Sequence, residues 1–107
     1  MLDPITIQDI VANLKRFEPE KVILFGSQSN GLSNNDSDID LLIVKNIPEN
    51  DIRKLRIEIK LALWTNLNSL QKHFDVIVDS EERIEQRILM GDLFYKEIYT
   101  NGTPLYV

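Results

Sequence analysis

Two aspartates at the start of an apolar run have the spacing of a metal-binding pair. Asp38 and Asp40 are two residues apart, and the residues from Leu41 to Val44 are all apolar. In a β-strand, side chains at positions i and i+2 point to the same face, so the two carboxylates lie side by side. Like charges this close repel one another unless a cation neutralises them, and carboxylate oxygens are ligands that Mg²⁺ and Mn²⁺ prefer. The pair therefore predicts a site for one of these metals.

A third aspartate interrupts another apolar run further along the chain. Asp75 stands in the segment from Phe74 to Val78, which has the pattern of a buried strand. An aspartate in such a strand is destabilising unless a partner compensates its charge. If this strand pairs with the one that follows Asp38, three carboxylates can hold two metal ions against the attacking and leaving oxygens of a phosphoryl displacement. We expect Asp38, Asp40 and Asp75 to act together as catalytic residues and metal ligands.

A glycine–serine pair precedes the two aspartates and is suited to contacting a phosphate. Gly26 directly follows the apolar run 21–25, and it has no side chain, so its backbone can approach a phosphate closely or adopt positive φ. Ser27 offers a hydroxyl group and a backbone N–H. If a helix begins there, its N-terminus adds further N–H donors. A glycine–serine pair alone is a common turn, so this prediction rests on its combination with the two aspartates.

The remaining pattern predicts the elements that must position these residues. Apolar residues at helical spacing predict helices over 5–17, 51–70 and 93–100. Short apolar runs predict strands over 21–25, 39–44, 74–78 and 104–107. Thr6 is the expected N-cap of the first helix, and Ser80 is expected to cap a further helix. This order predicts an α/β (α+β) fold with a small mixed β-sheet flanked by helices, and we expect residues 1–107 to form a single domain.

The predicted helix over 51–70 carries a second apolar stripe. Its expected core face comprises Ile52, Leu55, Ile59, Leu63 and Leu67. Ile57, Leu61 and Trp64 lie roughly 140° away from that face at ~100° per residue. Two interpretations remain open at this point. Either other segments bury the second stripe, or it is a partner-binding surface with Trp64 as its anchor, because tryptophan is enriched at interface hot spots.

The composition excludes several kinds of site. The 107 residues include no cysteine and one histidine, so disulfides, thiolate metal sites and multi-histidine zinc sites are excluded. The net charge is −5 and the lysines and arginines are scattered, so we expect no stable nucleic-acid binding, although brief contact with an RNA end stays open. There is neither an apolar run of ~20 residues nor a secretory signal, so the expected location is cytoplasmic, without membrane contact.

The combined motif resembles a known signature. Gly26-Ser27, ten residues, and then Asp38-Ile39-Asp40 are similar to the Gly-Ser-x10-Asp-x-Asp signature of the DNA polymerase beta-like nucleotidyltransferase superfamily. The small size resembles its minimal, MNT-type branch. The resemblance implies the polymerase beta-like nucleotidyltransferase fold and a single nucleotidyltransferase domain over 1–107. It also implies that Asp38 and Asp40 bind the Mg²⁺ or Mn²⁺ that carries ATP, that Asp75 completes the metal site and acts as general base, and that Gly26 and Ser27 contact the triphosphate.

The resemblance also implies a partner. MNT-type proteins commonly pair with a HEPN-type toxin as its antitoxin, and active members transfer AMP from ATP to a tyrosine of that toxin. We therefore expect this chain to transfer a nucleoside monophosphate to a hydroxyl of a HEPN-type protein. Many relatives carry an arginine after the glycine–serine pair, whereas Gln28 to Gly31 contains no basic residue. Without that basic residue, a non-catalytic antitoxin that blocks its partner by occlusion stays open. Transfer to a small molecule or RNA end also stays open as a function, and a homodimer as an assembly.

Overall fold

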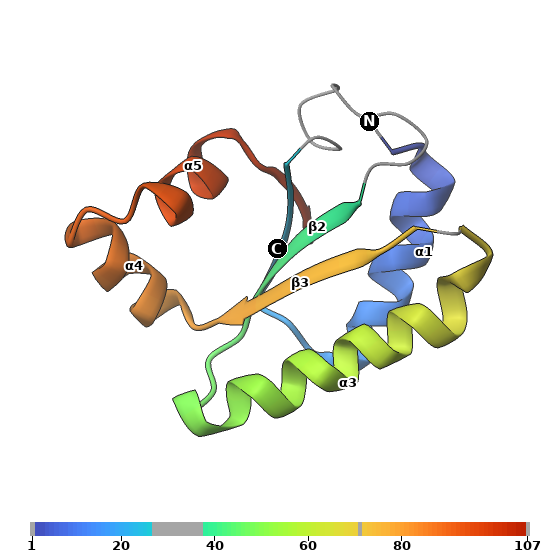
Figure 1. Ribbon diagram of the computed structural model, residues 1–107, viewed down its shortest axis with the longest axis horizontal. Coiled ribbons are helices and arrows are strands. Elements are labelled where there is room, and N and C mark those ends of the chain that lie inside the picture. The colour runs from blue at the N-terminus through green and yellow to red at the C-terminus, as the bar shows by residue number, and fades with distance from the viewer. Residues whose placement is uncertain (1, 27–37, 71, 107) are drawn as a thin grey trace.

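The computed structural model describes residues 2–26, 38–70 and 72–106, and in them a four-stranded sheet carries helices on both faces (Figure 1). The strands are β1 (Lys21–Phe25), β2 (Ile39–Val44), β3 (Phe74–Asp79) and β4 (Thr103–Tyr106). Their order across the sheet is β3-β2-β1-β4. Strand β1 runs antiparallel to both β2 and β4, whereas β2 and β3 are parallel. The predicted α+β fold with a small mixed sheet is therefore confirmed, and so is the edge position of the last strand.

The described helices lie in two layers. They are α1 (Pro4–Leu14), α3 (Glu49–Leu67), α4 (Glu81–Leu89) and α5 (Leu93–Asn101), and short 3-10 turns extend α1 to Phe17 and α3 to Leu70. Helices α1 and α3 cover one face of the sheet, and α4 and α5 cover the other (Figure 1). Strand β2 lies between these layers, with Leu41 and Ile43 in one core cluster and Leu42 and Val44 in the other. Burial on both faces explains why its sequence is almost continuously apolar.

Side-chain caps fix where the helices begin. Ser80 caps α4 as predicted, because its hydroxyl accepts a hydrogen bond from the Arg83 N–H at 3.2 Å. The expected Thr6 cap on α1 is wrong. Asp3 is the N-cap, since its carboxylate accepts the Thr6 N–H at 2.8 Å while Thr6 lies buried within the helix. Pro4 then occupies the first helical turn, where a missing N–H is tolerated, so the helix starts earlier than expected.

A network around Asp79 fastens α4 and α5 to the end of β3. One oxygen of its carboxylate accepts hydrogen bonds from the Ser80 N–H at 2.9 Å and from Arg83 Nε at 2.7 Å. The other oxygen accepts the Tyr95 hydroxyl at 2.8 Å. Arg83 also donates to the Ile47 carbonyl at 2.9 Å. Because these bonds join elements that are distant in the sequence, α5 has a fixed position on its face of the sheet.

A second contact holds the C-terminal half of α5. The Tyr99 hydroxyl donates to Glu81 at 3.0 Å, and Glu81 also pairs with Lys21 of β1 at 3.3 Å. Burial and the bond to a carboxylate raise the pKa of both Tyr95 and Tyr99 above the ordinary 10.0.

Among the described residues, no helix is both long and apolar enough to cross a membrane.

Removal of the Tyr95 hydroxyl should weaken this attachment. Tyr95→Phe is expected to lower the free energy of unfolding by about 1–1.5 kcal/mol, because the buried end of Asp79 loses a donor. The folded state holds the tyrosine proton more tightly than the unfolded chain. Wild-type stability should therefore fall as the pH rises above about 10, and it should fall less in the variant. Urea unfolding at pH 7 and at several pH values above 9 measures both effects.

Tyr106→Phe is the matched control at pH 7. Within the part of the chain that the structure describes, the Tyr106 hydroxyl makes no hydrogen bond, so its removal should change stability little. Equal losses in the two variants would show that the bond to Asp79 does not hold α5.

Candidate active site

The pairing of the central strands brings Asp40 and Asp75 together. In the parallel register of β2 and β3, Asp40 is the partner of Asp75, and in the antiparallel register of β1 and β2 it is the partner of Phe25. Register partners on neighbouring strands have side chains on the same face. Leu42 and Ile77, two residues further along β2 and β3, pack in the core beneath α4 and α5. Phe25, Asp40 and Asp75 therefore all lie on the α4–α5 face of the sheet.

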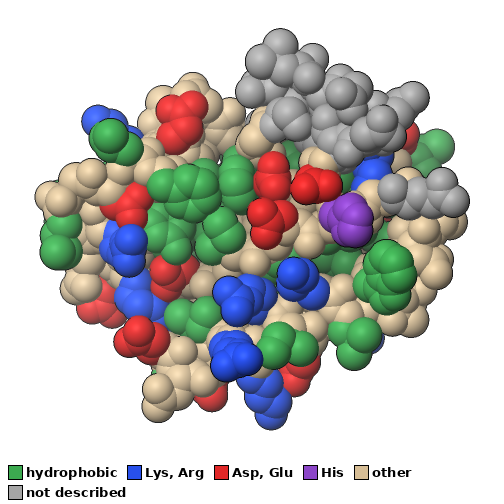
Figure 2. Space-filling model, in the orientation of Figure 1, with side chains coloured by type: hydrophobic (Ala, Val, Ile, Leu, Met, Phe, Trp, Pro, Cys, Tyr) green, Lys and Arg blue, Asp and Glu red, His purple; other side chains and the backbone are tan. Residues whose placement is uncertain are grey.

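The three predicted carboxylates differ in exposure. Asp38 immediately precedes β2 and is exposed, whereas Asp40 is half-buried. The expectation that Asp75 is a buried aspartate is wrong. It is exposed, because β3 is an edge strand, so its ends are open to solvent on one side. Figure 2 shows acidic side chains gathered on one face of the molecule, beside the single histidine of the chain.

The carboxylates are close enough to affect one another. Partial burial, followed by the negative charges of Asp75 and Asp38, raises the pKa of Asp40 above its ordinary value. A divalent cation would relieve this repulsion, and three carboxylates are a donor set that Mg²⁺ or Mn²⁺ accepts. Within residues 2–26, 38–70 and 72–106, however, no three acidic or histidine side chains already converge in a metal-coordinating arrangement. The chemistry of the residues fits a metal, and binding would have to draw the carboxylates closer together.

Gly26 directly follows β1 and lies beside Asp40. Its φ is +76°, a conformation that residues with a side chain rarely adopt. A Cβ atom built at this position would collide with the carboxylate of Asp40. The expected positive φ is present. The described neighbour of Gly26 is a carboxylate, so its expected contact with a phosphate stays a prediction. Ser27 and the segment from Gln28 to Gly31 lie outside the described residues.

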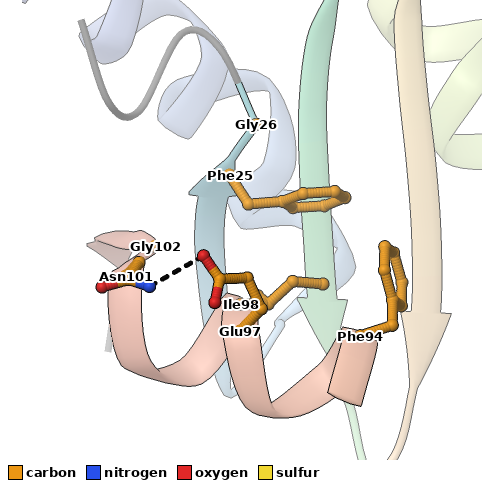
Figure 3. Close-up of a pocket in the computed structure, with 7 residues that line it drawn as sticks. All are labelled: Phe25, Gly26, Phe94, Glu97, Ile98, Asn101 and Gly102. Atoms are coloured by element: carbon orange, nitrogen blue, oxygen red, sulfur yellow. Dashed lines mark hydrogen bonds between the residues drawn. The ribbon is translucent and has the colours of Figure 1, made fainter. Parts of the chain in front are cut away.

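A cleft of about 310 Å³ opens next to Gly26, between the end of β1 and α5 (Figure 3). It is lined by Phe25, Gly26, Phe94, Glu97, Ile98, Asn101 and Gly102. The rings of Phe25 and Phe94 meet edge to face, with centroids 5.8 Å apart. Asn101 Nδ2 donates a hydrogen bond to Glu97 Oε1 at 2.7 Å, as the dashed line in Figure 3 indicates.

Sequence reasoning assigned no role to the residues of α5 that line this cleft. The available signal was their helical spacing, which puts Phe94, Glu97, Ile98 and Asn101 along one side of the helix. That spacing predicts a shared face but not which strand the face meets. The attachment of α5 through Tyr95 and Tyr99 decides that it faces the end of β1.

The second stripe of α3 is exposed in this chain. The exposed fractions of Ile57, Leu61 and Trp64 are 52 %, 63 % and 59 %. No described segment covers them, so the interpretation that they belong to the core is wrong. Leu61 and Trp64 line a shallow cleft of about 360 Å³ together with Lys60, His73 and Phe74. Phe74 directly precedes Asp75, but their side chains point to opposite faces of β3, so this cleft and the three carboxylates lie on either side of the edge strand.

Two comparisons with known proteins agree with this arrangement. Residues 7–101 match the family model of the nucleotidyltransferase domain. A solved structure described as "Crystal structure of the toxin-antitoxin with AMP-PNP" has a similar fold, with a TM-score of 0.58 and 21 % sequence identity over 94 % of this chain and 72 % of that chain. The comparison with curated proteins finds no match. The predicted polymerase beta-like nucleotidyltransferase fold is confirmed.

The collision at Gly26 leads to a stability prediction. Gly26→Ala and Gly91→Ala should each destabilise the fold by about 1–2 kcal/mol, because both glycines have positive φ. Gly26→Ala should be the more destabilising, since a Cβ at Gly91 would meet no atom within 4 Å. Urea unfolding of both variants measures the difference.

A double variant isolates the cause of this difference. Adding Asp40→Ala to Gly26→Ala removes the carboxylate from the path of the new Cβ, so the two changes together should destabilise less than the sum of their separate effects. Equal losses at Gly26 and Gly91, with additive effects at Asp40, would contradict the close approach.

Proposed function

Because the chain belongs to the nucleotidyltransferase domain family, we propose that it transfers AMP from ATP to a hydroxyl group of a partner protein in a metal-dependent reaction. One observation carries the proposal. The register of β2 and β3 makes Asp40 the neighbour of Asp75, and Asp38 is close enough to contribute to the raised pKa of Asp40. Three carboxylates at one end of a sheet, beside a glycine whose backbone a phosphate could approach closely, are suited to phosphoryl transfer.

Each carboxylate has a distinct proposed task. Asp38, Asp40 and Asp75 would hold Mg²⁺ or Mn²⁺, which when bound neutralises charge on the triphosphate and polarises its phosphorus–oxygen bonds. Asp75 is exposed on the outer strand, so it would also accept the proton of the attacking hydroxyl as general base. The acceptor oxygen forms a bond to the α-phosphorus as the bond to the β-phosphate oxygen breaks, and pyrophosphate leaves.

Gly26 and Ser27 are proposed to position the triphosphate. Because Gly26 has no side chain, its backbone lies against the Asp40 carboxylate, and it would also let phosphate oxygens held by the metal come close to that backbone. Ser27 follows directly, and its hydroxyl and N–H would supply donors for those oxygens. Neither group needs to change during the reaction, so their contribution is positioning rather than proton transfer.

The proposed acceptor is a HEPN-type toxin, with this chain as its antitoxin. Support comes from the similar fold of the toxin–antitoxin structure and from the exposed stripe of α3. Trp64 and Leu61 offer apolar anchors, and the nearby basic residues Arg53, Lys54 and Lys60 would suit an acidic rim on the partner. That cleft ends at Phe74 on the α3 side of the edge strand β3, so a partner bound at Trp64 would bring its hydroxyl to Asp75 by extending around that edge.

An alternative function is an antitoxin that acts by occlusion alone. The sequence from Gly26 to Val44 contains no lysine or arginine, so no basic side chain of that stretch meets the triphosphate. Both functions require the complex. Only the enzyme increases the mass of its partner by one AMP group in the presence of ATP and Mg²⁺.

Replacing a carboxylate should stop transfer without weakening the fold. Asp38→Asn, Asp40→Asn and Asp75→Asn should each lower transfer by at least about 100-fold, because each removes a metal ligand and Asp75→Asn also removes the base. Their free energies of unfolding should not fall, since each change reduces charge repulsion. Mass spectrometry of a HEPN-type partner protein, incubated with the variants, ATP and Mg²⁺, measures transfer.

Asp9→Asn provides the control, because Asp9 is exposed on α1, and it should leave transfer unchanged. Undiminished transfer in the three site variants would rule out this mechanism. An unmodified but tightly bound partner with the wild-type chain would favour occlusion.

The docking surface yields a separate prediction. Trp64→Glu should weaken partner binding by at least about 30-fold, because it puts a charge at the proposed anchor. Its thermal unfolding should match wild type, since the tryptophan is 59 % exposed. Leu89→Glu, at a position that is 87 % exposed on α4, is the matched control and should leave binding unchanged. Titration calorimetry with the same partner tests this, and wild-type affinity in Trp64→Glu would exclude the surface.

A further inference from the structure

The cleft between β1 and α5 has no role in the reaction as described so far. We propose that it binds the adenine base of the nucleotide, which stacks on Phe94 and donates its amino group to Glu97. This inference rests on the proposed function, because it assumes that the phosphates lie beside Gly26 and Asp40. It adds the residues that select the base.

The position of the cleft favours a part of the same ligand. Gly26 lines the cleft and also lies against the Asp40 carboxylate, because it has no Cβ that would collide with that side chain. Phe25, another lining residue, is the register partner of Asp40 and lies on the same face of the sheet. The two sites are therefore adjacent, and a ligand with its phosphates at Asp40 can extend its base over Phe25 toward α5.

The walls of the cleft suit a flat ring. Phe94 is 52 % exposed, although a large aromatic side chain is usually covered. Phe25 supports its ring edge to face, and Ile98 is buried beneath the cleft. A volume of about 310 Å³ is at the lower end of the range for small-molecule sites, which suits a base better than a whole nucleotide. Aromatic rings are the usual stacking platforms for bases.

The polar end of the cleft favours one kind of base. A carboxylate accepts hydrogen bonds and donates none, so Glu97 requires an N–H group on its ligand. One oxygen of Glu97 is already engaged by Asn101 at 2.7 Å, so the other oxygen is the better placed to accept a donor of the ligand. Adenine presents one amino group, whereas guanine presents two adjacent N–H donors that match a carboxylate with both oxygens free. Hypoxanthine has a carbonyl oxygen in place of the adenine amino group, and the carboxylate would repel it.

Nucleotide binding tests the base site directly. Titration calorimetry of the whole chain with Mg²⁺ and ATP, ITP, GTP or CTP gives the preference. ATP should bind at least about 10-fold more tightly than ITP and GTP, because a site built to accept one donor rejects analogues that lack it or present it elsewhere. ATP should also bind more tightly than CTP, because the single ring of cytosine stacks over less of Phe94. Equal affinities, or no ATP binding at millimolar concentration, would overturn the inference.

Three variants assign the preference to named residues. Phe94→Ala should weaken ATP binding by about 10-fold through lost stacking. Glu97→Gln keeps an acceptor for Asn101 but adds a donor, so the preference for ATP over ITP should shrink toward about 1. Leu93→Ala is the control, since Leu93 is a 77 % exposed neighbour on the same helix that does not line the cleft. An unchanged ATP/ITP ratio in Glu97→Gln would overturn the role of Glu97.

These measurements separate the base site from the proposed function. Nucleotide binding needs no acceptor. If the chain prefers ATP as expected but transfers no AMP, the base site is supported and the transfer activity is excluded. If the chain transfers with equal kcat/KM for ATP, ITP and GTP, and Phe94→Ala does not lower kcat/KM, the transfer activity is supported and the base site is excluded.

Discussion

The register between β2 and β3 is the constraint on which the rest of the structure depends. A shift of one residue would turn every side chain of β2 to the opposite face and send Asp40 into the core beneath α1 and α3. The apolar residues of β2 cannot prevent such a shift, because they are buried on both faces. The polar ends of the strands prevent it. Asp40 must remain at the open end, and Asp79 at the other end of β3 is bound to Ser80, Arg83 and Tyr95.

The network at Asp79 also links stability to the candidate site. It fixes α5 at one end of the sheet through Tyr95, and the far end of α5 is held through Tyr99 and Glu81. With the helix attached at two points, Phe94, Glu97 and Asn101 face the end of β1. The three carboxylates of Asp38, Asp40 and Asp75 have the opposite effect on stability, because their charges repel one another and raise the pKa of Asp40. Stabilising bonds are thus gathered at one end of the sheet, and the residues proposed to do chemistry are gathered at the other.

The exposed stripe of α3 and the three carboxylates lie on either side of the start of β3, which is an edge strand. Trp64 and Leu61 share a cleft with His73 and Phe74, and Asp75 follows in the sequence. Figure 2 shows acidic, histidine and apolar side chains close together on this face of the molecule. Docking and transfer, as proposed, would therefore use neighbouring surfaces. The nucleotide would approach from the α5 side of Asp40, and the acceptor from the β3 side.

The sequence by itself determined the features that depend on neighbouring residues. Periodicity predicted the strands and helices to within a few residues, Ser80 was identified as a cap, and the need for glycine at position 26 followed from the turn. A local error, Thr6 in place of Asp3, arose because two polar side chains three residues apart could each cap the same helix. The signature formed by Gly26, Asp38 and Asp40 identified the family, since those residues are close in the chain.

Only the tertiary structure decided which distant residues meet. Asp75 was expected beside Asp40, but its exposure depends on β3 being an edge strand, which no local pattern reveals. The cleft joins Phe25 to Phe94, and the exposure of Trp64 depends on what packs around α3. The physical reason is the same in each case. Hydrophobic periodicity specifies which face of a helix or strand is apolar. The order of the strands and the docking of the helices specify what that face touches.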